Sequence, residues 1–128
     1  MQTQRSLDEF RNEPFTDFSN PANAAAFKAA LEKVRSELGR EYPIVIGGEK
    51  LSLDHKFNST DPAEKSRVVG VFSEGDTDTS LVDRAIATAG EAFLSWRNVP
   101  YAERAEYLFK AAELMRQRKH ELSAWMVF

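Results

Sequence analysis

The chain has 128 residues, of which 42% are hydrophobic and 29% charged, a composition typical of one globular domain. Its net charge of -3 provides no basic surface for nucleic acid, and the absence of cysteine excludes disulfides and a cysteine nucleophile from this chain. No apolar run approaches the roughly 20 residues that span a bilayer. The polar N-terminus is unlike a signal peptide, so we expect a cytoplasmic protein without nucleic-acid or membrane partners.

Residues 1–19 show no sustained hydrophobic period. Phe10, Phe15 and Phe18 are spread among polar residues. The sequence therefore predicts an extended arm whose aromatic rings dock on another surface, and it places the globular part of the chain in residues 20–128.

The first regular element is a predicted helix from Asn20 to Gly39. Asn20 can cap its first turn, Pro21 suits the first helical position, and Gly39 can adopt the left-handed conformation that commonly ends a helix. Apolar residues recur on one face of this helix at three- and four-residue steps. They are Phe27, Ala30, Leu31, Val34 and Leu38.

Strands are predicted next. The runs Pro43–Gly47 and Lys50–Lys56 flank Gly48-Glu49, and glycine permits the positive φ of a tight hairpin turn. In the first run Ile44 and Ile46 would share one face, with Val45 on the other. A dense turn signal follows at Asn58–Pro62. A third strand is predicted at Arg67–Ser73, and it would end at Glu74–Asp76.

The segment Thr77–Phe128 predicts two amphipathic helices and the start of a third, with breaks at Asn98–Pro100 and near Arg118–His120. Asp78 is a candidate N-cap for the first of them. The apolar stripe of the first helix is Val82, Ala85, Ile86, Ala89, Phe93 and Trp96, and that of the second is Leu108, Ala111, Ala112 and Met115. Across the whole chain, the predicted core residues are Phe27, Leu31, Val34, Ile86, Phe93, Trp96, Leu108 and Met115.

The last seven residues are strongly apolar and have no cap. We expect the large side chains of this run to face water. An exposed apolar run at this position is typical of the front part of a larger protein. These side chains are Leu122, Trp125, Met126, Val127 and Phe128. The run would then cause self-association, leave the chain partly molten, or pack against another polypeptide.

The residues alone indicate no catalytic, cofactor-binding or metal site. His55 and His120 are far apart in sequence, whereas a zinc site needs three or four converging ligands. His120 is better explained as a residue that caps or packs at a helix break. Gly47-Gly48 leads into a strand, whereas a dinucleotide-binding turn leads into a helix, so a hairpin turn is preferred. The carboxylates mostly occupy the polar faces of predicted helices. They are Glu32, Glu37, Glu41, Glu91, Glu103, Glu106 and Glu113.

The predicted fold class is an α+β fragment with an N-terminal helix, a small β-hairpin plus a third strand, and two to three amphipathic helices. The motifs IGGE, STDP, RVVGVFSEG, LVDRAIATAGEAFLSW and AERAEYLFKAAELMRQRKHEL occur in this order. This order resembles the N-terminal segment of the NAD(P)-dependent aldehyde dehydrogenase superfamily. The stretch NEPFTDFSNPANAAAFKAALEKVRSELGREYPIVIGGE is similar to the L-glutamate γ-semialdehyde (1-pyrroline-5-carboxylate) dehydrogenases of that family.

The resemblance implies that residues 20–128 are the first portion of the NAD-binding domain in an aldehyde dehydrogenase α/β fold. It also implies a homo-oligomeric parent enzyme that uses NAD and oxidises the semialdehyde to glutamate in proline catabolism. The catalytic cysteine, the general-base glutamate and the cofactor-binding glycines of the family have no counterpart here. We therefore expect an inactive scaffold segment without its own cofactor, whose partner is the remainder of the dehydrogenase or a second copy. A helical interaction module derived from this segment is the alternative.

Overall fold

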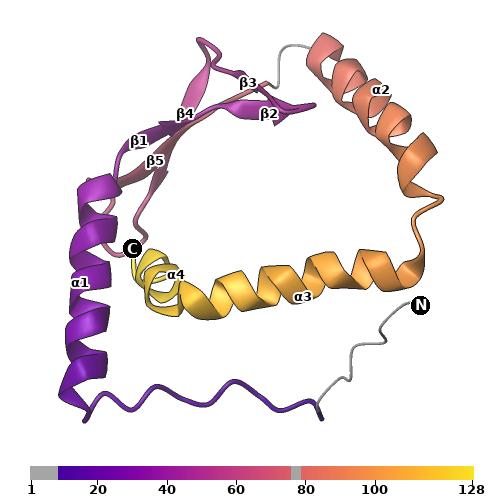
Figure 1. Ribbon diagram of the computed structural model, residues 1–128. Coiled ribbons are helices and arrows are strands. Elements are labelled where there is room, and N and C mark those ends of the chain that lie inside the picture. Colours follow the sequence, from indigo (N-terminus) through magenta and orange to yellow (C-terminus); the bar gives the residue numbers. More distant parts are fainter. Residues whose placement is uncertain (1–8, 76–78) are drawn as a thin grey trace.

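The chain follows an open ring rather than a closed layered domain. The structure is a computed structural model that describes residues 9–75 and 79–128. Helix α1 (Pro21–Glu37) forms one side of the ring, followed by two small sheets and then by helices α2 (Thr79–Trp96) and α3 (Tyr101–Gln117). The short helix α4 (Lys119–Trp125) brings the chain back to α1 and closes the ring (Figure 1).

The first helix begins and ends as its sequence predicts. The side-chain oxygen of Asn20 accepts a hydrogen bond of 2.9 Å from the N–H of Ala22, which satisfies one of the free donors of the first turn. Gly39 follows the helix with a φ of 76°, a left-handed conformation that costs glycine little. The predicted capping residues are therefore confirmed.

The larger sheet has three strands in the order β1 (Arg40–Tyr42), β5 (Val68–Ser73) and β4 (Lys56–Thr60). Strand β5 is central, because it pairs parallel with β1 and antiparallel with β4. The parallel pair is possible because residues 43–67 lie between β1 and β5 and provide the long connection that parallel strands require. The predicted third strand is thus confirmed as the centre of this sheet.

Three aromatic rings stack across the strands of this sheet. The ring of Phe72 lies 5.1 Å from that of Tyr42 and 5.5 Å from that of Phe57, measured between centroids. All three residues share one register line, because Tyr42 and Phe57 are both the partners of Phe72 in the ladder. Such cross-strand pairs stabilise a sheet beyond its backbone hydrogen bonds.

The smaller sheet is the predicted hairpin, formed by β2 (Ile44–Ile46) and β3 (Glu49–Leu51). Gly47 and Gly48 form its turn with φ values of 59° and 84°, as a two-residue turn with positive φ at both positions requires. The alternation predicted for β2 is also confirmed, because Ile46 is buried and Val45 is exposed.

Two strand predictions were wrong. The run predicted as one strand, Lys50–Lys56, contains the last two residues of β3 and the first residue of a separate strand, β4. The turn predicted at Asn58–Pro62 begins only at Asp61, since Asn58, Ser59 and Thr60 pair with β5. Strand formation here depends on a neighbouring strand that supplies hydrogen-bond partners, and this overrides the turn preference of the local sequence. The described residues therefore form five strands where three were predicted.

The helical half agrees with the predicted breaks. Helices α2 and α3 are separated around Asn98–Pro100, and α3 and α4 are separated at Arg118. The predicted N-cap Asp78 lies outside the described residues. None of the described helices combines the length and the hydropathy that a bilayer-spanning helix needs.

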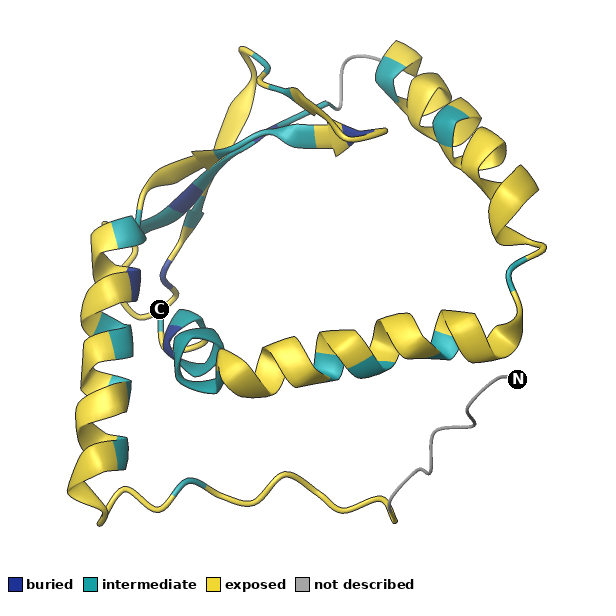
Figure 2. Cartoon of the chain, viewed as in Figure 1, coloured by how far each residue is buried: buried dark blue, intermediate teal, exposed yellow. Residues whose placement is uncertain are grey.

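The packed helical core lies between α1 and α4 (Figure 2), and Ile46 on β2 is buried separately from it. Val34 on α1 and Ala124 on α4 are both 0% exposed, and Phe27 and Leu31 are half-buried. The other predicted core residues are exposed, with Leu108 reaching 73%. These residues are Ile86, Phe93, Trp96, Leu108 and Met115. Their helical spacing was read correctly, but among the described residues these faces of α2 and α3 have little cover beyond the contact between Trp96 and Tyr107.

The apolar C-terminal run is more covered than predicted. Leu122, Trp125 and Phe128 are half-buried, because α4 packs against α1. Only Met126 and Val127 of the run's large side chains are exposed. The expectation that the whole run faces water was therefore wrong, since α1 had not been recognised as its packing partner.

Candidate functional site

The glycine pair of the hairpin is a structural turn. Gly47 and Gly48 join two antiparallel strands, and the next helix begins only at Thr79. A phosphate-binding loop needs its glycines directly before a helix N-terminus, where the free N–H groups point at the anion. Moreover, a Cβ on Gly47 would lie 3.0 Å from the side-chain methyl group of Thr88, so α2 occupies the space beside the turn. The predicted hairpin turn is confirmed.

The two histidines lie on different elements. His55 is exposed in the loop between β3 and β4, where its carbonyl accepts a hydrogen bond of 2.9 Å from the N–H of Glu74. His120 is half-buried in α4, with its ring 6.2 Å from that of Phe27 on α1. Within residues 9–75 and 79–128, no three side chains of the metal-binding types come together. His120 packs beside the break between α3 and α4, as predicted.

Most of the predicted surface carboxylates are exposed. The exception is Glu37, which is half-buried and pairs with Arg40 at 3.4 Å. A general acid needs a raised carboxyl pKa to hold its proton near neutral pH, whereas the resolved carboxyl shifts in the described chain are downward. These downward shifts indicate ion pairs and hydrogen bonds that hold elements together.

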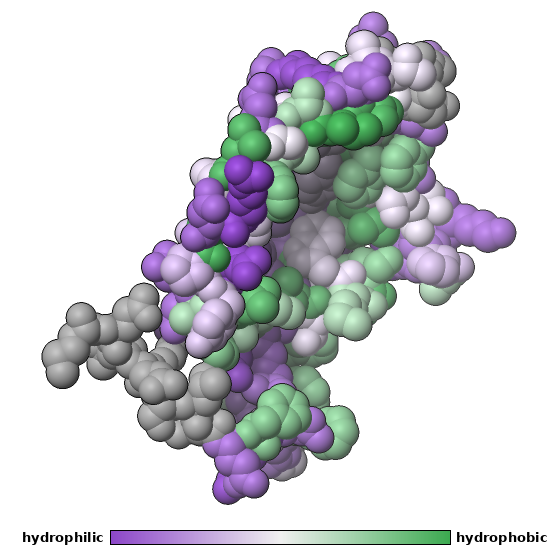
Figure 3. Space-filling model, turned by 90° about the vertical axis from the view of Figure 1, so that its right-hand side faces the viewer, coloured by the Kyte–Doolittle hydropathy of each residue, from purple (hydrophilic) through white to green (hydrophobic). Residues whose placement is uncertain are grey.

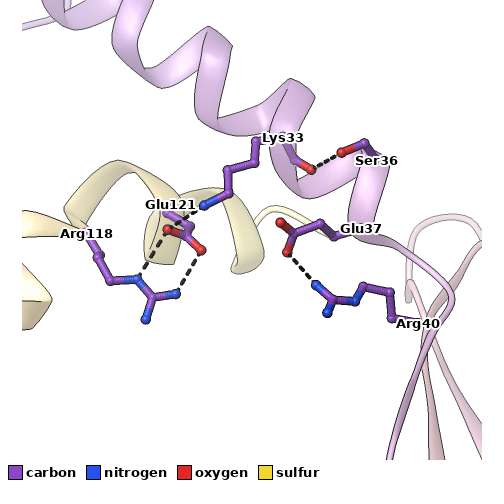
Figure 4. A network of polar contacts seen from close by, with 6 residues as sticks. All are labelled: Lys33, Ser36, Glu37, Arg40, Arg118 and Glu121. Atoms are coloured by element: carbon purple, nitrogen blue, oxygen red, sulfur yellow. Dashed lines mark hydrogen bonds and ion pairs between the residues drawn. The ribbon is translucent and has the colours of Figure 1, made fainter.

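The carboxyl group with the most strongly lowered pKa is that of Glu121, in the first turn of α4. Its oxygens accept hydrogen bonds of 2.8 and 3.2 Å from the guanidinium of Arg118, and the ammonium of Lys33 on α1 lies at 3.1 Å (Figure 4). Hydrogen bonding to Arg118, followed by that to Lys33, lowers the pKa of Glu121 to about 2. The position of Glu121 near the N-terminal end of α4 also suits a negative charge. Sequence reasoning missed this network because Lys33 is distant in sequence.

A second carboxylate, Asp61, organises the turn between β4 and β5. It is 3% exposed and accepts hydrogen bonds of 2.7 Å from the N–H of Ala63 and 2.7 Å from the guanidinium of Arg67. The backbone hydrogen bond from Ala63 is the main cause that lowers the pKa of Asp61. Arg67 also pairs with Glu64. The Asp-Pro signal predicted a turn here, and the structure gives its chemical basis.

Arg67 extends this cluster to the C-terminal residue. Its guanidinium carbon lies 5.5 Å from the ring centroid of Phe128, and that of Arg35 on α1 lies at 5.7 Å. A cation within about 6 Å of an aromatic ring is attracted to the ring's π-electrons. Phe128 therefore contacts α1 and the start of β5 together, which explains why it is not exposed as predicted.

The most extensive candidate site is an uncovered apolar surface, here called the α2–α3 face. It consists of the exposed residues Val82, Ile86, Phe93, Leu94, Trp96, Tyr101, Leu108 and Met115. Figure 3 shows hydrophobic side chains grouped on the side of the molecule that carries these helices. Exposed apolar patches of this kind mark interaction surfaces rather than active sites.

The charge pattern of α2 supports this interpretation. Asp83, Arg84 and Glu91 are the charged residues of this helix, and at 3.6 residues per turn they fall within about 100° of its circumference. Arg84 pairs with Glu49 on β3, so the charged sector borders the hairpin. The remaining circumference carries no charge, and a helix of this kind is normally covered on more than one side. Among the described residues, α2 contacts the hairpin and, at its C-terminal end, α3, where the ring of Trp96 lies 5.6 Å from that of Tyr107.

Comparison with known proteins gives this arrangement a context. The profile of the aldehyde dehydrogenase family matches residues 49–128. The 1-pyrroline-5-carboxylate dehydrogenases of Geobacillus thermodenitrificans and Geobacillus kaustophilus are 49% and 50% identical to the chain over 121 residues. These matches include 94% of the chain and 23% of each relative.

Solved structures show the same fold. A mutant of 1-pyrroline-5-carboxylate dehydrogenase from Thermus thermophilus superposes with a TM-score of 0.87 at 37% identity, and the match covers 97% of this chain and 24% of that one. The Thermus enzyme with bound NAD gives a TM-score of 0.84 at 38% identity, and covers 94% and 23%. The chain thus spans about a quarter of the length of these relatives and is homologous to their N-terminal region. The chain belongs to the aldehyde dehydrogenase family.

Proposed function

We propose that this chain is the N-terminal scaffold segment of an NAD-dependent L-glutamate γ-semialdehyde (1-pyrroline-5-carboxylate) dehydrogenase, and that it is inactive alone. The complete enzyme would oxidise the semialdehyde to glutamate in proline catabolism. The identity of about half to curated 1-pyrroline-5-carboxylate dehydrogenases supports this substrate assignment. A homo-oligomeric enzyme and a cytoplasmic location stay predictions.

The observation that supports the proposal is the uncovered α2–α3 face. The chain matches only 23% of the length of its relatives, so most of such an enzyme is available to cover this face. Burial of each large apolar side chain contributes about 1.5–3 kcal/mol, so a covering surface would gain much from this face. We assign that covering role to the remainder of the dehydrogenase. Under this assignment, the remainder of the dehydrogenase, with its catalytic residues, fills the ring formed by these helices and strands.

NAD would be bound by that remainder. The relatives include structures that contain NAD. The turn at Gly47-Gly48 does not fit a dinucleotide, because it precedes a strand and has Thr88 beside it. The described residues accordingly supply support for the enzyme rather than a step of its chemistry.

A split-enzyme experiment tests the proposal. The Geobacillus thermodenitrificans relative is truncated to remove the part that matches this chain, and the chain is then added as a separate polypeptide. We expect no NADH formation from glutamate semialdehyde with either piece alone and measurable turnover with both. Variants Ile86→Lys and Leu108→Glu on the α2–α3 face should abolish the recovered activity, while Glu32→Gln on the exposed side of α1 should not. Turnover by the chain alone, or recovery that ignores the two face variants, would contradict the proposal.

A non-catalytic helical interaction module is the second candidate. The observation in its favour is that α1 and α4 bury Val34 and Ala124 fully within this chain, which gives it a small core of its own. Such a module would bind the truncated relative without restoring turnover, or would not bind it at all. An intact-mass measurement on the natural protein, compared with its open reading frame, separates the two candidates independently.

A further inference from the structure

A single carboxylate fastens the N-terminal arm across the junction of α3 and α4. One oxygen of Glu13 lies 3.3 Å from the ammonium of Lys119, and the other lies 3.5 Å from the guanidinium of Arg116. Lys119 also donates a hydrogen bond of 3.2 Å to the carbonyl of Pro14. These contacts, here called the Glu13 clasp, join the arm to residues from the opposite end of the chain.

Neither phenylalanine of the described arm before Asp17 is buried. Phe15 is 103% exposed, and Phe10 is exposed as well. The next anchor occurs where the arm meets α1, since the ring of Phe18 lies 5.4 Å from that of Phe27 and the carbonyl of Asp17 accepts a hydrogen bond from Asn23. The described arm before Asp17 is therefore held mainly through charge.

The clasp lies between two apolar grooves. Glu13, Lys119 and Ser123 line both of them. One groove lies between arm residues 14–16 and the side chains of Phe18, Phe27, His120 and Val127. The other continues along α3 and α4 over Ala112, Met115, Leu122 and Met126. Release of the arm would take away the Glu13 wall that the two grooves share and the wall that residues 14–16 give the first groove.

We propose that the arm is a strap that ionic strength releases, and that opening of the Glu13 clasp merges the two grooves into one open apolar surface, because the arm supplies a wall of each. Glu13 and Arg116 are more than half exposed, and such ion pairs are weak and screened by salt. No apolar anchor at Phe10 or Phe15 replaces the lost attraction. The turn at Asp17–Ser19, whose bonds lie within the turn or reach α1, stays in place when the strap opens.

Tryptic cleavage of the bond between Arg11 and Asn12 reports on the strap. The protease must bind several residues on each side of that bond in extended form, including Glu13 and Pro14, which the clasp holds against Lys119. The rate of this one cleavage is followed by mass spectrometry on the 128-residue chain and is divided by the rate for a free peptide of residues 9–19. Salt is raised from about 0.01 M to about 1 M, which shortens the Debye length from about 30 Å to about 3 Å.

We expect the normalised rate to rise about threefold to tenfold with salt, as two exposed ion pairs allow. Glu13→Gln should cleave fast at low salt and lose the salt response. Glu9→Gln is the matched control, because Glu9 pairs with Arg11 inside the arm itself. Glu13→Lys should release the strap, and Lys119→Glu added to it should restore protection. A rate that does not depend on salt, equal effects of the two glutamine variants, or failure of the charge reversal would each overturn the proposal.

Discussion

The ammonium group of Lys33 on α1 lies 3.1 Å from the carboxylate of Glu121 on α4, and this ion pair links the two helices that form the core. Arg118, the residue that separates α3 from α4, donates hydrogen bonds to the same carboxylate. The side chain of Glu121 is only 16% exposed, so water screens these contacts less than an ordinary surface pair. The closure of the ring thus has an electrostatic component beside Val34 and Ala124.

The first prediction concerns the pH dependence of stability. The pKa of Glu121 falls from 4.5 to about 2 on folding, so the unfolded chain takes up a proton before the folded chain does. The stabilisation is complete above pH 4.5 and is lost as the pH falls from that value toward 2. Glu121→Gln should lower the melting temperature at pH 7 and flatten its decline between pH 5 and pH 3. Thermal melts of the wild type, of Glu121→Gln and of the control Glu32→Gln check this, and parallel pH profiles for all three would contradict it.

The second prediction concerns packing between α1 and α4. Val34 and Ala124 are both 0% exposed. Val34→Ala should destabilise the chain by about 2 kcal/mol through lost burial and a residual cavity. Ala124→Leu should cost about 1–3 kcal/mol, because the added atoms have no space. Urea denaturation measures both. The control Ala29→Leu, on the exposed side of α1, should have little effect, and a loss as large as that of Ala124→Leu would contradict the assignment of the core.

The third prediction separates backbone strain from contact with α2. Gly48 has a φ of 84° and open space where a Cβ would lie, so Gly48→Ala should cost about 1–2 kcal/mol from strain alone. Gly47→Ala should cost more, because its Cβ would also lie 3.0 Å from Cγ2 of Thr88. Thr88→Ser removes that methyl group and should recover part of the loss for Gly47→Ala and none for Gly48→Ala. Equal recovery in both backgrounds would show that α2 does not contact the turn.

Elements with a local signal were predictable from the sequence. Helix α1, with its Asn20 cap and Gly39, and the turn at Gly47 and Gly48 are specified by residues adjacent in the chain. Strands β1 and β4 were not predicted as such, because each exists through pairing with β5. Pairing between segments distant in sequence leaves little trace in a single short strand.

The same limit applies to the candidate sites. The helical period of α2 and α3 identified the apolar stripes, but it does not say what covers them, so Ile86 and Leu108 were placed in a core that this chain lacks. The Glu121 network and the Glu13 clasp join residues from opposite ends of the chain. In the sequence these charged residues look like any surface residues. They interact with one another only in the folded chain, where its distant segments meet.

The last prediction concerns which apolar residues drive self-association. The sequence alone predicts that replacement of Trp125 and Phe128 by glutamate improves solubility, because both belong to the apolar C-terminal run. The structure changes this expectation, because Trp125 is half-buried on α4, which packs against α1, whereas Ile86 and Leu108 are exposed on the α2–α3 face. Trp125→Glu should therefore lower the melting temperature and increase aggregation, since a charge would replace packed apolar surface.

Two charged replacements on the α2–α3 face should have the opposite effect. Ile86→Lys places a cation three residues after Asp83, and Leu108→Glu places an anion four residues after Arg104, so both additions suit their own helices and together leave the net charge unchanged. Exposed sites of this kind change the free energy of unfolding by no more than about 0.5 kcal/mol. Sedimentation velocity over a range of concentrations should show a larger monomer fraction for the double variant than for the wild type, with an unchanged melting temperature. If the double variant associates as strongly as the wild type, another surface mediates the association. If its melting temperature falls as much as that of Trp125→Glu, the α2–α3 face is already covered within the chain.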